Sequence, residues 1–148
     1  MKICNGEFII RLDADDWLNE NALLVLFSKI NSKKNYGAAY GGYYYVDENG
    51  DELGIENNFD ITKKNLNLPP HGACTLFKTR ALKEVGGYST SISAQDGWDV
   101  WLKLKERVEF CSINLPLFYY RKHGQSLSDN YQRIIKERGK IFKNLGKN

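Results

Sequence analysis

Residues 6–16 read Gly6-Glu7-Phe8-Ile9-Ile10-Arg11-Leu12-Asp13-Ala14-Asp15-Asp16, a run of large apolar residues that passes directly into carboxylates. The apolar part has no helical period and is rich in residues that favour strands. It therefore predicts a buried strand that ends in an acidic loop.

The acidic loop holds three carboxylates within four positions, at Asp13, Asp15 and Asp16. Like charges this close repel one another unless a cation neutralises them. Mn²⁺ or Mg²⁺ would do so, because these hard ions take carboxylate oxygens and leave positions for water and phosphate. The alternative is a turn or helix cap that binds no metal.

The first half of the chain predicts a helix and a hairpin. Asn19 can cap a helix in which Leu23, Leu26, Phe27 and Ile30 repeat at three- and four-residue steps, so one face packs on a sheet. The Asn49-Gly50 pair after residues 38–46 is a strong hairpin signal. Residues 57–70 predict a long loop that overhangs the acidic loop.

The second half adds a buried strand at residues 73–78 and two further strands, near 108–113 and at 117–121. A short helix over 80–85 is capped by Thr79 and ends at Gly86-Gly87, and helical patterns follow at 100–105 and 129–144. The expected fold is α/β, a mixed sheet flanked by helices with a hairpin and a basic C-terminal helix. Residues 1–148 are expected to form one domain.

Composition excludes several classes of protein. A chain of 148 residues with 42% hydrophobic residues can bury a core without metal or disulfide staples. The cysteines Cys4, Cys74 and Cys111 form no CxxC pair, which favours free thiols and a cytoplasmic location. No apolar run is long enough to span a membrane. The 21 basic and 18 acidic residues are too balanced to argue for nucleic acid.

The basic residues are nevertheless concentrated at the end of the chain. Residues 131–148 hold six basic residues against Glu137 alone. Such a helix can lie on anionic lipid, which would place the protein at the inner face of the membrane, or it can be a solvated face.

Four segments resemble inverting glycosyltransferase family 2, which has the GT-A fold. They are the strand and DXD segment 6–16, Phe77 to Tyr88, the acidic motif Gln95-Asp96 with Trp98 to Leu104, and Tyr120 to His123 with Ser126 and Ser128. The segments stand in the order that the family has. The resemblance implies transfer of a sugar, with inversion, from a nucleotide-diphosphate sugar to a glycan or lipid-linked acceptor hydroxyl in polysaccharide synthesis.

The resemblance also implies roles for single residues. Asp13 would face the nucleotide's ribose or the water shell of the metal, and Asp15 with Asp16 would hold Mn²⁺ or Mg²⁺ against the diphosphate. Asp96 would be the general base. It stands five residues before Trp101 where the family has four. Either Gly97 is an extra residue that leaves Asp96 as the base, or Asp99 is the base, or the base is absent. His123 would be a further metal or phosphate ligand.

In the family, a nucleotide-binding half precedes the segment that holds the carboxylates. Here Asp13 follows the first residue closely. We therefore expect a truncated domain with an open sheet edge, covered by a second copy of the chain or by a separate N-terminal half. The alternative function is a catalytically silent fragment or binding module that needs such a partner chain.

Overall fold

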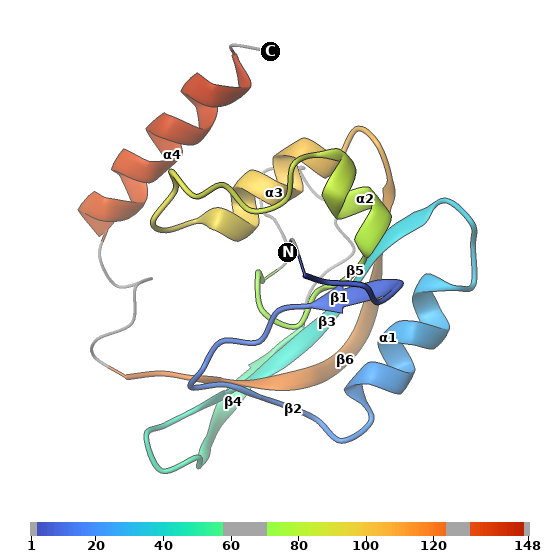
Figure 1. Ribbon diagram of the computed structural model, residues 1–148. Coiled ribbons are helices and arrows are strands. Elements are labelled where there is room, and N and C mark those ends of the chain that lie inside the picture. Colours follow the sequence, from blue (N-terminus) through green and yellow to red (C-terminus); the bar gives the residue numbers. More distant parts are fainter. Residues whose placement is uncertain (1–2, 58–70, 124–130, 147–148) are drawn as a thin grey trace.

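The computed structural model describes residues 3–57, 71–123 and 131–146, which form one sheet and the helices around it (Figure 1). The elements in chain order are β1 Phe8–Ile10, β2 Trp17–Leu18, α1 Ala22–Ile30, β3 Tyr36–Val46, β4 Glu52–Glu56, β5 Leu76–Lys78, α2 Thr79–Glu84, α3 Asp96–Leu104, β6 Glu109–Arg121 and α4 Tyr131–Leu145.

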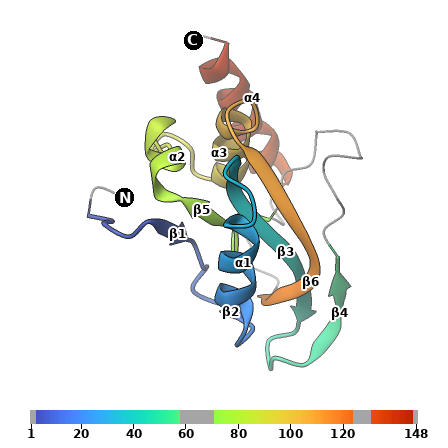
Figure 2. The same cartoon turned by 90° about the vertical axis from the view of Figure 1, so that its right-hand side faces the viewer.

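The sheet is mixed, as the sequence predicts. Its strand order is β1-β5-β3-β6-β2, and β4 pairs with β3 beyond the end of β5. Strands β3 and β6 run parallel, while the other strand pairs are antiparallel. Figure 2 shows β3 and β6 side by side through the centre of the molecule, with β1 at one margin. The long strand β3 therefore connects the two ends of the sheet.

Helices cover both faces of the sheet. On one face, Leu26 and Ile30 of α1 join a buried cluster with Ala39, Cys111 and Phe118. On the other face, α2 and α3 pack through a second cluster, which comprises Ala38, Tyr40, Phe77, Ala81, Leu82, Val100, Trp101, Leu104 and Phe110. Neighbours along a strand alternate between the clusters, because successive side chains of a strand point to opposite faces.

The predicted hairpin is confirmed. Asn49 and Gly50 lie in the turn between β3 and β4, and Gly50 has a φ of 95°, which a side chain would strain. The carboxylate of Asp47 accepts backbone N–H groups from Asn49 and Asp51, at 2.8 and 2.9 Å. The predicted end of the second helix is also confirmed, because Gly86 and Gly87 both have positive φ.

Three predictions need correction. Thr79 is the first residue of α2 and not its cap, and its hydroxyl is buried without a hydrogen-bond partner among the described residues. The strands expected at 108–113 and 117–121 form the single strand β6, in which Pro116 is accommodated where the register against β3 shifts at Gly42. The buried face of α1 consists of Ala22, Leu26 and Ile30, whereas Leu23 and Phe27 are about half exposed. The short strand β2 was not predicted, because two residues give no pattern.

Other expectations fall partly outside the described residues. They are the loop at 57–70, of which only Asn57 is described, and the first two residues of the helix at 129–144. The three cysteines are free thiols, and burial raises the pKa of Cys74 to about 12. Within the described ranges, no helix has the length and apolar character needed to cross a membrane.

Candidate functional site

The acidic loop joins β1 to β2, and Asp16 anchors it. The side chain of Asp16 is buried, and one of its carboxylate oxygens accepts the backbone N–H of Arg121 at 3.0 Å. The other oxygen is buried without a hydrogen-bond partner among the described residues. Burial, and then the charges of Asp15 and Asp13, raise the pKa of Asp16 to about 6, although the N–H of Arg121 opposes this shift.

Arg121 holds the loop from the end of β6. Its Nε donates to the backbone oxygen of Asp15 at 3.2 Å, and its Nη1 donates to the backbone oxygens of Asp47 and Glu48 in the hairpin turn. The guanidinium also lies 5.0 Å from the ring centre of Trp17. The acidic loop, β6 and the hairpin are thus connected through one side chain.

Asp15 is the exposed carboxylate of the loop. Its Oδ2 lies 2.8 Å from Nε2 of His123, which follows β6. Asp15 therefore comes from the acidic loop near the start of the described chain, and His123 comes from the residues that follow β6. The structure brings these two predicted ligands together.

Asp13 lies on the other side of the loop and is paired with Arg11. The guanidinium of Arg11 contacts Asp13 Oδ1 through Nη2 at 2.8 Å and through Nε at 2.9 Å, and it contacts Asp96 Oδ2 through Nη1 at 2.5 Å. Burial alone would lower the pKa of Arg11, but the hydrogen bonds and charges of Asp96 and Asp13 raise it well above its ordinary value. Arg11 therefore joins the acidic loop to α3.

Asp96 is the first residue of α3, and the backbone around it is unusual. Gln95 before it has a left-handed φ of 64°. Gly97 after it donates its N–H to Asp96 Oδ1 at 2.9 Å. A Cβ on Gly97 would stand 2.9 Å from Cα of Gly72, closer than real structures allow. The extra glycine of the sequence motif is thus the point where α3 meets the segment 71–75.

Asp99 lies apart from this arrangement. Only 1% of its side chain is exposed, and its Oδ2 accepts Nζ of Lys103 at 2.5 Å, one helical turn further on. A carboxylate buried and paired in this way does not face an acceptor. We therefore keep Asp96 as the candidate base.

Two neighbours of the site had no clear signal in the sequence. Arg11 follows β1, and no motif in the sequence assigns it a role. Only the fold shows that its guanidinium reaches Asp96. His71 is inserted between aromatic rings, with ring centres 4.8 Å from Tyr120 and 5.1 Å from Tyr43. Burial lowers the pKa of His71. Its imidazole lies near Asp13 and Arg11, whose charges also act on its pKa.

We define the carboxylate site as Arg11, Asp13, Asp15, Asp96 and His123. Its donor atoms can be compared with the ligands that a Mn²⁺ or Mg²⁺ ion prefers. Asp15 and His123 present an oxygen and a nitrogen at one exposed point, and Asp16 has an unpartnered oxygen nearby in sequence. The described residues contain no preformed group of three or more such ligands. This fits an ion that is held by one or two protein ligands and completed by water and phosphate oxygens.

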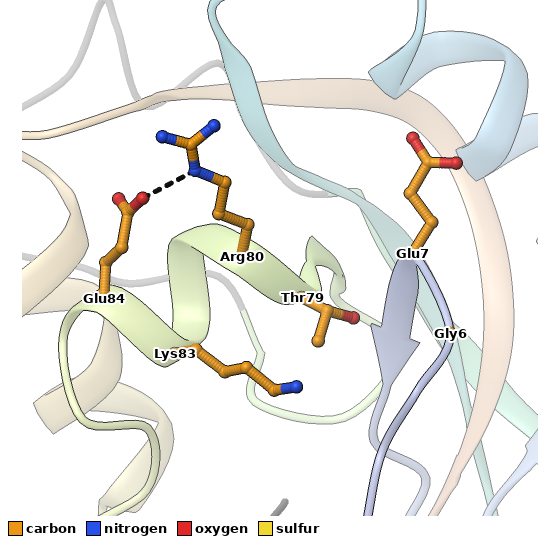
Figure 3. A pocket seen from close by; sticks show the side chains of 6 residues that line it. All are labelled: Gly6, Glu7, Thr79, Arg80, Lys83 and Glu84. Carbon is orange, nitrogen blue, oxygen red and sulfur yellow. Dashed lines mark hydrogen bonds and ion pairs between the residues drawn. The ribbon is translucent and has the colours of Figure 1, made fainter.

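A separate depression of about 540 Å³ lies between the edge of β1 and α2 (Figure 3). It is lined by Gly6, Glu7, Thr79, Arg80, Lys83 and Glu84. Arg80 and Glu84 pair with each other at 2.8 Å across one helical turn. None of the residues of the carboxylate site lines this depression.

The family follows from comparison with known proteins. The model of glycosyl transferase family 2 matches residues 1–86, more than half of the chain. The chain therefore belongs to glycosyl transferase family 2, as its motifs indicated.

Two curated relatives are also glycosyltransferases. The chondroitin synthase of Escherichia coli is 26% identical over 140 residues, which are 93% of this chain and 20% of that protein. An uncharacterized glycosyltransferase of Rickettsia conorii is 27% identical over 116 residues, which are 70% of this chain and 19% of that protein. The chain spans about a fifth of the length of these relatives.

A solved structure shares the fold. The crystal structure of S. aureus TarS 1–349 in complex with UDP-GlcNAc superposes with a TM-score of 0.59 and 16% sequence identity. The match covers 87% of this chain and 38% of that one. The α/β fold described above is thus that of a glycosyltransferase domain.

Proposed function

We propose that this domain transfers a sugar from a nucleotide-diphosphate sugar to an acceptor hydroxyl, with inversion, in the synthesis of a polysaccharide or other glycan. The observation that carries the proposal is the bridge from Asp13 through Arg11 to Asp96, at 2.8 and 2.5 Å. The bridge puts the acidic loop next to the candidate base, so donor and acceptor can meet between them.

Asp96 is proposed as the general base. Its carboxylate is oriented by two donors from different segments, Nη1 of Arg11 and the N–H of Gly97. About a third of its side chain is exposed, so an acceptor hydroxyl can approach. The carboxylate would take the hydroxyl proton as the oxygen attacks the sugar, and direct displacement gives inversion.

Asp15 and His123, with Asp16, are proposed to hold Mn²⁺ or Mg²⁺. When bound, the ion would offset the negative charge that develops on the leaving diphosphate. Asp13 would contact the ribose or the water around the ion. Arg11 is proposed to keep Asp13 and Asp96 at a fixed separation through its planar guanidinium.

A partner polypeptide is the second part of the proposal. No described strand pairs with the outer edge of β1. The backbone oxygens of Glu7 and Arg11 accept N–H groups from the β5 side, so the N–H and C=O groups of Phe8 and Ile10 point outward. A second copy or a separate nucleotide-binding half would pair there. The unpaired edge also favours the alternative function, in which the domain is catalytically silent without a partner chain.

The location of the protein is proposed to be cytoplasmic. Cys74 and Cys111 are buried thiols, and Cys4 is also unpaired. Unpaired cysteines are typical of a reducing compartment. The nucleotide-sugar donor would be drawn from the same compartment.

Calorimetric titration tests the proposal. The chain would be titrated with Mn²⁺ and with UDP, singly and together, and compared with Asp15→Ala. The matched control is Asp51→Ala, which removes an exposed carboxylate in the hairpin. We expect UDP binding that requires Mn²⁺, is lost in Asp15→Ala and persists in Asp51→Ala.

Absence of heat with every combination, from a chain shown to be folded by circular dichroism, would favour the silent module. Equal loss in both variants would contradict a specific role of Asp15. Adding the partner polypeptide, once found, would then show whether it restores nucleotide binding.

A further inference from the structure

One flank of α4 carries an apolar stripe, which we define as Tyr131, Ile135 and Phe142. These side chains are 73%, 54% and 56% exposed. Phe142 also contacts α3, because its ring centre lies 5.7 Å from that of Trp98. At about 100° per residue, the three positions lie within roughly 40° of one another around the helix axis. Exposed apolar side chains that align in this way are unusual on a surface that meets only water. The stripe therefore indicates a surface that contacts another phase or molecule.

Basic residues lie on the face of α4 next to the stripe, with Lys136 and Lys143 roughly 80–140° further around the helix axis. The helix Tyr131–Leu145 holds five basic residues and a single acidic one, Glu137. Glu137 is buried and accepts Nζ of Lys140 at 2.6 Å, so this carboxylate does not face outward. Lys136 and Lys143 are exposed, and neither forms an ion pair within the described part of the chain. The outer surface of α4 is thus positive as well as apolar.

The helix is fixed to the segment that leads into α3. Glu137 Oε2 accepts the backbone N–H of Ser93 at 3.1 Å, and Nε of Arg138 donates to Gln95 Oε1 at 3.2 Å. The guanidinium of Arg138 lies 4.1 Å from the ring centre of Trp98. Figure 1 shows α4 at the margin of the molecule, beside α3 and away from the sheet. Tyr131 and Ile135 are therefore exposed on an ordered helix, which packs against α3 through Phe142 and Arg138.

We propose that α4 binds the surface of a bilayer that contains anionic lipids. The stripe enters the boundary between headgroups and acyl chains, and the flanking lysines meet lipid phosphates. A stripe of three residues is far smaller than the roughly 800 Å² per partner that a stable protein interface needs. Nucleic acid would engage the lysines but would leave the apolar side chains without a role. Charge and shape together thus favour lipid.

This proposal goes beyond sugar transfer and does not depend on it. Binding through α4 would orient the domain on the bilayer. The segment before Asp96 would then lie beside the helix that contacts the lipid, because α4 also holds this segment. The two proposals are tested by different readouts, so failure of one leaves the other standing.

Sedimentation with vesicles tests the proposal. Binding would be measured to phosphatidylcholine vesicles with and without about 30% phosphatidylglycerol, at low and at high salt. We expect binding only with the anionic lipid, and binding that weakens as salt rises. Ile135→Ser should weaken binding about tenfold, and Lys143→Gln about fivefold.

Matched controls are Leu53→Ser and Lys34→Gln, which change an exposed leucine in the hairpin and a lysine far from α4. Both controls, and Asp15→Ala, should bind as the unaltered chain does. Circular dichroism would verify that each variant is folded.

Several outcomes would overturn the proposal. They are absence of binding, equal binding to vesicles without anionic lipid, and equal loss in Leu53→Ser and Ile135→Ser. A dimer seen by analytical ultracentrifugation that Ile135→Ser abolishes would assign the stripe to a second copy instead.

Discussion

Arg11 donates to the carboxylate of Asp96, 85 positions further along the chain, over 2.5 Å. The same guanidinium contacts Asp13 at 2.8 Å. These ion pairs are the link between the two halves of the carboxylate site. Their strength can be measured without any assay of sugar transfer.

A double-mutant cycle with Arg11→Gln and Asp96→Asn should give a coupling of about 1 kcal/mol, since both side chains are about one-third exposed and water screens the pair. The measurement is the free energy of unfolding in urea. The matched control is Arg80 and Glu84, whose side chains are 91% and 51% exposed. That pair should give about 0.3–0.5 kcal/mol. Equal couplings for the two pairs would contradict the special position of Arg11.

Asp99→Asn should separate stability from binding. The substitution removes the buried carboxylate that pairs with Lys103, whose own side chain is 25% exposed, so we expect a loss of roughly 1–3 kcal/mol in the free energy of unfolding. Metal-dependent UDP binding should be unchanged at a temperature where the variant is folded. Asp96→Asn should lower stability less. Loss of nucleotide binding in folded Asp99→Asn would return Asp99 to the site.

Gly97→Ala should destabilise the domain. The new Cβ would meet Cα of Gly72 at 2.9 Å, and a backbone atom cannot move aside as a flexible side chain can. We expect a loss of about 1–3 kcal/mol, read from the urea midpoint. Gly139→Ala is the control, because nothing lies within 4 Å of the added Cβ and alanine favours a helix by about 1 kcal/mol. The two glycine substitutions should therefore act in opposite directions.

Glu137 should make stability depend on pH. Its hydrogen bonds with Lys140 and then with Ser93 lower its pKa below the ordinary value of 4.5. The unfolded chain takes up the proton near 4.5 while the folded chain still excludes it, so the stabilisation is present above that pH. It is lost as the pH falls below 4.5, through the lower pKa of the folded state. As the pH falls through this window, the free energy of unfolding in urea should decline more steeply for the unaltered chain than for Glu137→Gln.

The local patterns were sufficient for much of the fold. The hairpin followed from Asn49-Gly50, because a turn type is set by adjacent residues, and the end of α2 followed from Gly86 and Gly87 for the same reason. The continuity of β6 through Pro116 could not be predicted. It depends on β3, whose shifted register at Gly42 accommodates the proline.

The carboxylates and the histidine of the carboxylate site were proposed from the sequence, but the contacts between them were not. The acidic loop and Asp96 were found by residue type and by the family's order of motifs. Arg11 was missed, since its role depends on a contact across 85 residues that no spacing rule encodes. The spacing to Trp101 left both Asp96 and Asp99 as candidate bases. Only the burial of Asp99 against Lys103 distinguishes them.

Strand β3 pairs with β4 and β5 along one edge and with β6 along the other. Its amide hydrogens should therefore exchange with deuterium only when the whole domain opens, whereas those of β1 and α4 should exchange through local fluctuations. The segment before β5 meets Gly97, next to Asp96, and His123 after β6 contacts Asp15. A ligand that joins Asp96 and Asp15 would therefore raise the melting temperature of the entire domain. Thermal melting thus becomes a screen for nucleotides and acceptors that requires no knowledge of the product.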